Sequence, residues 1–398
     1  MLVEILVAIG VGIACGVITG LTPGLHINLV AAMIISYSAL ILQHVNSLFV
    51  VIFLIALSVT HTFLDMIPSI FLGAPQEATA LGVLPGHRFL LRGEGMVALK
   101  LSVLGSLGAI IISIMLFPLL LIVIKGYVFI QPYIGFVLIG VAAIMILTEK
   151  RRTWALFVFC VAGLLGLIAL NMPNLENPLL PMLSGMFGIS TLIISLNKTQ
   201  SIAPQKIQQE VRIDKATTIK ALVSGQLSGF VTAVFPGLSS SIAAIMSMQA
   251  IRKLKEEGFM MLIGCIGTAN FVISMATLIA VGKARNGSIV AIQKLMPTIN
   301  ATTLLAGIAT MLISAGISVV LALEIGKMFS RIIGKVNYRK LLLGIICFVT
   351  MLVAFVTGWI GVLVLVISTS IGIIPAITKV SRTQSMGCLL LPVIISYF

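Results

Sequence analysis

Charged residues are scarce in this chain of 398 residues: only 9% are Asp, Glu, Lys or Arg, whereas 59% are hydrophobic. Soluble domains carry about 25% charged residues, so the composition excludes an ordinary soluble protein. Apolar runs recur along the whole chain and provide about 10 to 12 membrane-spanning elements at ~20 residues per crossing. We therefore expect an all-α, multi-pass protein of the cell membrane.

The sequence also lacks the patterns of several functional classes. Its five cysteines stand singly in apolar stretches, so we expect neither a disulfide nor a zinc site. The four histidines lack the spacing of a zinc protease and no Gly-x-Ser-x-Gly element is present, so we expect no enzyme. The formal charge of +14 comes from Lys and Arg scattered through short loops, which argues against nucleic-acid binding. No cofactor or resident metal is expected.

Basic residues are absent before Arg88 and then cluster in short polar segments. These segments are 87–92, 149–152, 198–220, 252–255, 327–340 and 379–382. Cytoplasmic loops accumulate Lys and Arg, so we expect these segments on the cytoplasmic side. The loop at 171–178 has no basic residue and is expected outside.

Two apolar segments are interrupted in the same way. Residues 16–33, GVITGLTPGLHINLVAAM, align without a gap with residues 229–246, GFVTAVFPGLSSSIAAIM. The first segment has no basic residue on either flank, whereas basic segments flank the second. Similar segments that enter the bilayer from opposite sides are typical of inverted-topology repeats with broken or re-entrant helices. We expect a first repeat at 1–196, a cytoplasmic linker at 197–220 and a second repeat at 221–398.

Each interruption contains a Pro-Gly pair followed by polar residues. Proline lacks an amide donor and glycine tolerates unusual backbone angles, so both pairs should break their helices. Inside lipid, such breaks persist only where protein or a water-filled cavity solvates the backbone. The following helix N-termini would present free amides to an anion. An interfacial turn or a simple kink is the alternative for either segment. The candidate substrate-binding residues here are Pro23, Gly24, His26, Asn28, Pro236, Gly237, Ser239, Ser240 and Ser241.

Three stretches together resemble the large membrane subunit of tripartite tricarboxylate transporters, the TctA family. They are the duplicated Gly-rich run into Pro-Gly, GAPQEATALGVLPGHRFLLRGEGMVALKL at 73–101, and PMLSGMFGIS at 181–190. The resemblance spans most of the chain and implies an ion-driven secondary transporter of small carboxylates. It also points to Asn270, in GTANFVIS, as an ion-coupling residue. A soluble binding protein, a small membrane subunit and a homodimer are the assemblies left open.

Two ionisable residues interrupt the apolar run before residue 73. His61 and Asp65 are four residues apart and would share one face of a helix. Ionisable groups at membrane depth are costly and tend to face a cavity or a pathway. We expect them to couple transport to H⁺ or Na⁺. The alternative for Asp65 is a helix cap or a position near the interface.

Two further segments carry candidate anion-binding side chains. Glu77 and Thr79 follow Pro75 in the first half and lie at a predicted helix start; a surface loop is the alternative. In the second half, Arg285 can hold a carboxylate with two parallel hydrogen bonds, beside Asn286 and Ser288. A solvated loop is the alternative there.

The function that these patterns favour is ion-coupled transport of small di- or tricarboxylate-like anions by alternating access around the paired breaks. The alternative is a translocase for a phosphate-bearing lipid carrier, whose head group would use the same helix N-termini.

Overall fold

The computed structural model describes residues 2–22, 27–73, 79–126, 129, 131–175, 177–196, 203–235, 240–251, 254–284, 286–333 and 338–398, and these residues contain no β-strand. The elements of the first half are α1 (Leu2–Leu21), α2 (Ile27–Ser36), α3 (Ser38–Ile41), α4 (Ser47–Leu64), η1 (Pro68–Leu72), η2 (Ala80–Gly82), α5 (Val83–Leu91), α6 (Gly95–Met115), α7 (Phe117–Lys125), η3 (Gln131–Tyr133), α9 (Ile134–Leu147), α10 (Arg152–Leu170), α11 (Leu179–Leu183), η4 (Ser184–Ile189) and α12 (Ser190–Leu196). Those of the second half are α13 (Lys215–Val234), α14 (Ser240–Ala250), α15 (Glu256–Val281), α16 (Gly287–Leu295), α17 (Ala301–Ile333), α18 (Tyr338–Thr378), η5 (Arg382–Met386) and α19 (Gly387–Ser396).

Seven helices in the described part of the chain are long and apolar enough to cross a membrane. They are Leu2–Leu21, Ser47–Leu72, Gly95–Met115, Arg152–Leu170, Glu256–Val281, Ala301–Ile333 and Leu342–Thr378. The chain is an all-α, multi-pass membrane protein, so this expectation from composition is confirmed. The seven spans and two shorter apolar helices of the described residues, Ile134–Leu147 and Leu179–Ile194, are fewer than the 10 to 12 elements expected.

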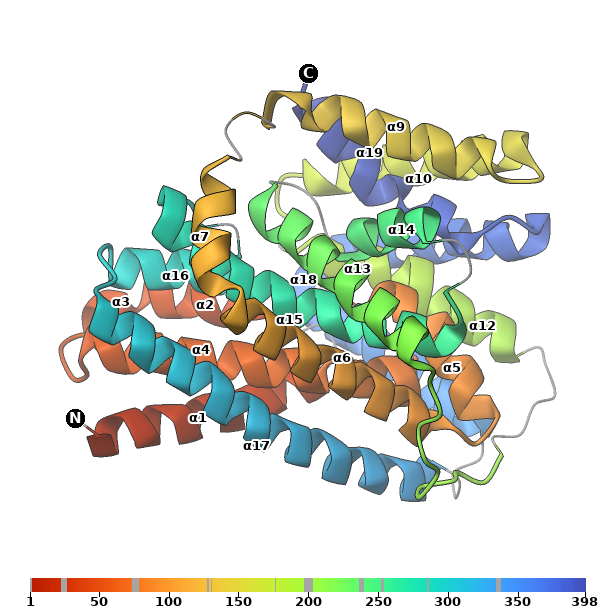
Figure 1. Ribbon diagram of the computed structural model, residues 1–398. Coiled ribbons are helices and arrows are strands. Elements are labelled where there is room, and N and C mark those ends of the chain that lie inside the picture. Colours follow the sequence, from red (N-terminus) through yellow and green to blue (C-terminus); the bar gives the residue numbers. More distant parts are fainter. Residues whose placement is uncertain are drawn as a thin grey trace.

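Two of these helices form the centre of the bundle. In the apolar stretches of α15 and of Ser47–Leu72, 83% and 72% of the residues are buried, against 33% in α1. Helices α1 and α17 pack on α4, whereas α13 and α6 pack on α15 (Figure 1). Because lipid drives no hydrophobic association between helices, close side-chain packing must hold these central pairs together.

Local sequence signals explain where the central helices begin and end. The Asn46 side chain accepts a hydrogen bond from the amide of Leu48 and caps the start of α4. Asp214 caps α13 in the same way, and hydrogen bonds from the hydroxyl and amide of Thr217 lower the pKa of its carboxyl. Gly73 and Gly282 end the two central helical segments with positive φ values of 63° and 64°. Glycine suits both ends because it adopts this backbone conformation without strain.

The remaining helices extend the bundle beyond this centre. Helices α9, α10 and α19 form a group near the C-terminus (Figure 1). A Cβ atom on Gly166 of α10 would lie 1.9 Å from the carbonyl oxygen of Cys388, so this packing requires glycine. The long α18 is broken by non-helical backbone at Gly358.

The described part of the segment predicted as a linker, from residue 203 on, contacts the first half. The amide of Lys206 donates to the carbonyl of Gly93, and the Lys100 ammonium donates to the carbonyl of Gln209. Helix α13 begins at Lys215, so residues 215–220 of the predicted linker belong to that helix.

The packing of α1 predicts opposite effects for two of its glycines. A Cβ on Gly16 would lie 2.6 Å from the Thr60 Cβ and 2.8 Å from the Leu57 oxygen, whereas a Cβ on Gly10 meets nothing within 4 Å. Gly16→Ala should destabilise the fold by about 1–3 kcal/mol through overpacking, as measured by thermal unfolding in detergent. Gly10→Ala is the control and should leave the midpoint unchanged or raise it slightly, because alanine favours helix. Equal midpoints for the two variants would refute this packing.

Candidate functional site

The helices around both Pro-Gly pairs have matching boundaries. Helix α1 ends at Leu21 and α2 begins at Ile27, while α13 ends at Val234 and α14 begins at Ser240. These four boundaries correspond one to one in the gap-free alignment of the two segments. The described helices on either side of each Pro-Gly pair therefore end and resume at equivalent positions; the Pro-Gly residues themselves lie outside the described residues.

Several predicted site residues are not placed. Outside the described residues lie Pro23, Gly24, His26, Glu77, Pro236, Gly237, Ser239 and Arg285. Asn28 lies in the first turn of α2, but its side chain is outside the described part. Ser240 begins α14 and is half-buried, and Ser241 is buried beside it. The candidate site is therefore built from the helices that surround the two interruptions.

Equivalent glycines allow close approach in two equivalent helix pairs. Gly16 of α1 packs on Thr60 of α4, and a Cβ on Gly229 of α13 would lie 2.4 Å from the Ala269 Cβ of α15. Gly16 and Gly229 are aligned residues of the two interrupted segments. Such small residues let helix backbones approach closely within a membrane.

The same two helix pairs carry equivalent polar contacts. In the first, the Thr19 hydroxyl donates to the carbonyl of Gly16, and His61 Nδ1 lies 3.0 Å from that hydroxyl oxygen. In the second, the Thr232 hydroxyl donates to the carbonyl of Gly229 and accepts a hydrogen bond from Asn270 Nδ2 at 2.8 Å. The Asn270 amide nitrogen can only donate, so Thr232 is the acceptor of that contact. The direction of the hydrogen bond between His61 Nδ1 and the Thr19 hydroxyl depends on the tautomer of the imidazole.

Buried hydroxyls connect α4 to three further helices. Ser58 donates to the Ser288 hydroxyl of α16 at 2.9 Å. Thr60 accepts from Ser318 of α17 at 3.0 Å, and Thr62 accepts from Thr268 of α15 at 3.1 Å. With the contact between His61 and Thr19 of α1, residues 58–62 bind four neighbouring helices. This polar turn of α4, residues 58–62, is called the hub below because its side chains join α4 to four other helices of the described structure.

Asp65 lies directly after this hub. It caps the C-terminus of α4, its amide donates to the carbonyl of His61, and its side chain is buried. None of the ion pairs among the described residues includes it. A Cβ on Gly20 of α1 would lie 3.2 Å from the His61 oxygen and 3.5 Å from the Asp65 nitrogen. The end of α1, just before the first Pro-Gly pair, therefore packs directly on the turn that carries both ionisable residues.

The two predicted anion-binding segments reach the same central helix. The Thr79 and Ser69 hydroxyls lie 2.6 Å apart, and Ser69 donates to the Asp65 carbonyl. Ser288 contacts Ser58, as described above. The side chain of Asn286 accepts the amide of Ser288 and caps α16, so its role here is to start the helix.

Among the residues that sequence reasoning selected, His61 lies on α4, Asp65 at its end and Asn270 on α15. Ser288 of α16 contacts α4, and Thr79 contacts Ser69 of η1. Sequence reasoning did not single out the hydroxyl residues that bind the central helices together, namely Thr19, Ser58, Thr60, Thr62, Thr232, Thr268 and Ser318. The signal for those on α4 was the density of polar residues in SVTHTFLD, within an otherwise apolar span.

The segments expected on the cytoplasmic side contact one another. Glu256, at the start of α15, forms ion pairs with Arg88 and Arg92. The Ser381 amide donates to the Glu149 carboxylate, and Arg151 donates to the carbonyl of Thr378. These contacts agree with a common location for the basic segments.

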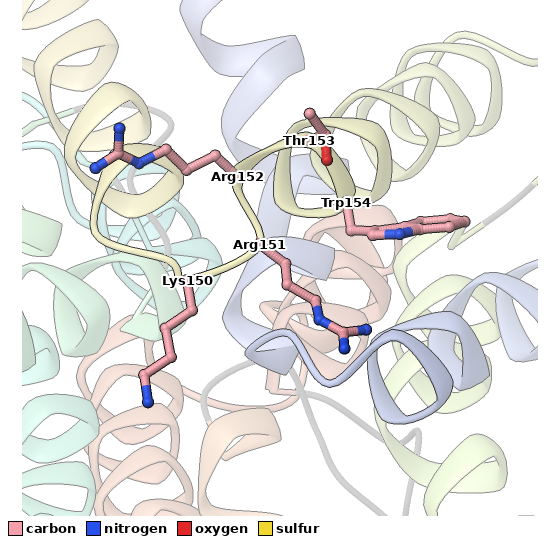
Figure 2. Close-up of a pocket in the computed structure, with 5 residues that line it drawn as sticks. All are labelled: Lys150, Arg151, Arg152, Thr153 and Trp154. Atoms are coloured by element: carbon pink, nitrogen blue, oxygen red, sulfur yellow. The ribbon is translucent and has the colours of Figure 1, made fainter.

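One of these segments forms an exposed basic loop before α10. Figure 2 shows Lys150, Arg151 and Arg152 pointing in different directions around an open hollow. Arg152 donates to the carbonyl of Leu147, and Trp154 follows in the first turn of α10. Basic residues beside an interfacial tryptophan are typical of contact with anionic lipid head groups.

Comparison with known proteins identifies the family. The profile of the tripartite tricarboxylate transporter TctA family matches residues 6–387. The chain belongs to this family. Membership implies a component of a tricarboxylate transporter, the large subunit, which works with partner subunits on a small-molecule substrate. The chain is also 32% identical over 389 residues to the uncharacterized protein MJ1079 of Methanocaldococcus jannaschii, with 94% of each chain covered. No solved structure gives a significant match.

The contact between Asn270 and Thr232 predicts a measurable loss of stability. Asn270→Ala should destabilise this TctA-family protein by about 1 kcal/mol because an interhelical hydrogen bond within the membrane is lost. Asn171→Ala is the control, since the exposed Asn171 donates only within its own helix region, to Leu167. Thermal unfolding in detergent measures both variants. Thr232→Val combined with Asn270→Ala should cost less than the sum of the two single changes; additive losses would contradict the contact.

Proposed function

We propose that this TctA-family protein is an ion-coupled secondary transporter of small di- or tricarboxylate anions that works by alternating access. The observation that carries the proposal is the placement of His61 and Asp65, buried one helical turn apart at the hub of the bundle. Intramembrane ionisable residues mark ion pathways by default.

Asp65 is the proposed carrier of the coupling ion. A carboxylate buried away from water is strongly destabilised unless it holds a proton or lies beside a cation. A site that must be loaded with H⁺ or Na⁺ to be stable links ion occupancy to the conformation of the surrounding helices. The His61 imidazole is a second group that can accept a proton there.

The end of α1 is the proposed link between ion and substrate. Gly20 packs on the turn between His61 and Asp65, and Thr19 binds the His61 ring. A change of charge at Asp65 therefore acts on the last turn of α1, which leads into residues 23–26. We propose that Pro23, Gly24, His26 and Asn28 bind the anion there, and that Ser239, Ser240 and Ser241 bind it after Pro236 and Gly237.

We further propose that the two halves are inverted repeats. Support comes from the matched contacts of the two helix pairs and the paired glycine ends at Gly73 and Gly282. In Figure 1, α1 runs from the marked N-terminus toward the right, whereas α13 runs from right to left. In this arrangement, Glu77, Thr79, Arg285, Asn286 and Ser288 occupy related segments and complete the substrate site.

Asp65→Asn should abolish ion-driven uptake. We expect uptake of radiolabelled citrate or succinate into proteoliposomes to respond to an imposed gradient of either H⁺ or Na⁺ in the unaltered protein. The amide that replaces the carboxyl group carries neither a charge nor an exchangeable acidic proton, so gradient-driven uptake should fall by at least about tenfold, while exchange of internal for external anion persists. Asp214→Asn, which changes an exposed helix cap, should retain uptake. The purified partner subunits are added in a parallel set because the family is tripartite.

Full gradient-driven uptake by Asp65→Asn would show that Asp65 does not carry the coupling ion. Loss of exchange together with uptake would show a general defect instead of a coupling defect, and would equally contradict this role.

Opposite sidedness of two loops tests the inverted repeats. Single cysteines at Gln43 and Lys255, in a chain whose exposed Cys160 and Cys347 are replaced by serine, should react with a membrane-impermeant thiol reagent from opposite faces of oriented vesicles. Labelling of both positions from one face would disprove the inverted arrangement.

A further inference from the structure

A cavity of about 290 Å³ lies between the two halves, near the contacts of the basic segments. Its walls come from η2 and α5 of the first half and from α14, the start of α15 and η5 of the second. Most of its lining is apolar, and three charged side chains reach it: Arg88, Glu256 and Arg382. An apolar pocket with a few convergent polar groups is the usual form of a small-molecule site.

Arg382 differs from the other two charged residues. Arg88 and Arg92 both pair with Glu256, and Arg92 also pairs with Glu94, so the two positive and two negative charges of this group balance. None of the ion pairs among the described residues includes Arg382. Burial lowers the pKa of its guanidinium from the ordinary value, yet arginine keeps its charge in proteins. The cavity therefore holds one partly desolvated positive charge that lacks a carboxylate partner in the described structure.

The Arg382 guanidinium is held in position by one hydroxyl. Its Nη1 donates to the Thr191 hydroxyl, which in turn donates to the carbonyl of Phe187 at 2.5 Å. Thr191 and Arg382 come from different halves of the chain, and Phe187 also lines the cavity. One nitrogen of the guanidinium is thus anchored, and its planar fork retains donors for a carboxylate.

The cavity is connected to the proposed ion site through Thr79. Ala80 and Leu81, which line the cavity, directly follow Thr79. Thr79 contacts Ser69, whose hydroxyl donates to the carbonyl of Asp65. On the opposite wall, Met248 comes from α14, the helix that follows the second Pro-Gly pair. The cavity thus adjoins one element that leads to the proposed ion site and another that follows the second Pro-Gly pair.

We propose that this cavity is a binding site for the transported anion and that Arg382 binds one of its carboxylates. The assignment rests on the proposed transport function, and it names a substrate-binding residue outside both Pro-Gly segments. The basic segments around the cavity attract anions to this end of the bundle.

Equilibrium binding of radiolabelled citrate and succinate tests the assignment. The purified full chain is placed in phosphatidylcholine nanodiscs, so that no anionic lipid competes. Arg382→Gln should weaken the binding of at least one of the two anions by about 10-fold or more, because a charge-assisted hydrogen bond is lost. Arg382→Lys keeps the positive charge but not the planar pair of donors, so its affinity should lie between those of Arg382→Gln and the unaltered protein. Arg331→Gln, an exposed arginine on α17 outside the cavity, should bind like the unaltered protein.

A second measurement applies if Arg382→Gln does not fold. Thr383 lines the same cavity, so Thr383→Cys, in the chain without exposed cysteines, should be protected from alkylation by the anion that binds. Absence of protection would overturn the assignment.

Two other results would also overturn it. Equal anion affinity of Arg382→Gln and the unaltered protein would overturn the assignment, even if Asp65 proves to couple transport. Failure of both anions to bind, with Arg382-dependent binding of phosphatidylglycerol vesicles instead, would make the ligand a lipid head group. In Asp65→Asn, anion binding should lose its dependence on H⁺ or Na⁺ but keep its dependence on Arg382, which separates a failure of this site from a failure of ion coupling.

Discussion

The polar turn of α4 is the constraint on which the rest of the structure depends. Ser58, Thr60, His61 and Thr62 are buried, and each hydrogen bonds with a different neighbouring helix. Polar groups in a lipid-surrounded core are stable only when they are paired, so these contacts set where α1, α15, α16 and α17 can lie. Glycines then determine how closely the helices approach: Gly16 and Gly20 of α1 lie against this turn.

The proposed function rests on the energetic cost of burying charged groups in the same bundle. Asp65 continues the turn but has no ion pair among the described residues, and Arg382 lies in a cavity without one. Each of these charges can be balanced by a mobile ion: a cation or proton at Asp65 and an anion at Arg382. In the proposed mechanism these positions hold the coupling ion and the anion. Ser69 links the carbonyl of Asp65 to Thr79, which directly precedes the cavity residues Ala80 and Leu81.

The sequence predicted the class of fold and part of the site. Composition alone showed a helical membrane protein, and the position of Asp65 in an apolar run marked it as costly. Thr79 and Ser288 were chosen as anion-binding residues, and both reach α4 or the turn that follows it. The hydroxyl contacts could not be predicted because serine and threonine in membrane helices usually bond to their own preceding turn, as Thr357 does here. From the sequence, Arg382 was assigned only to a basic cytoplasmic segment. Its partial burial arises from contact with Thr191, which is nearly two hundred residues earlier in the chain and could not be paired with it from sequence alone.

Infrared difference spectroscopy tests the central claim most directly: that the carboxyl of Asp65 changes its proton or cation when the anion binds. Spectra of the protein in lipid are recorded with and without citrate or succinate, in light and heavy water. The account predicts a carboxyl band that shifts on anion binding and is absent from Asp65→Asn. A spectrum without such a band, or one with the same band in Asp65→Asn, would contradict it.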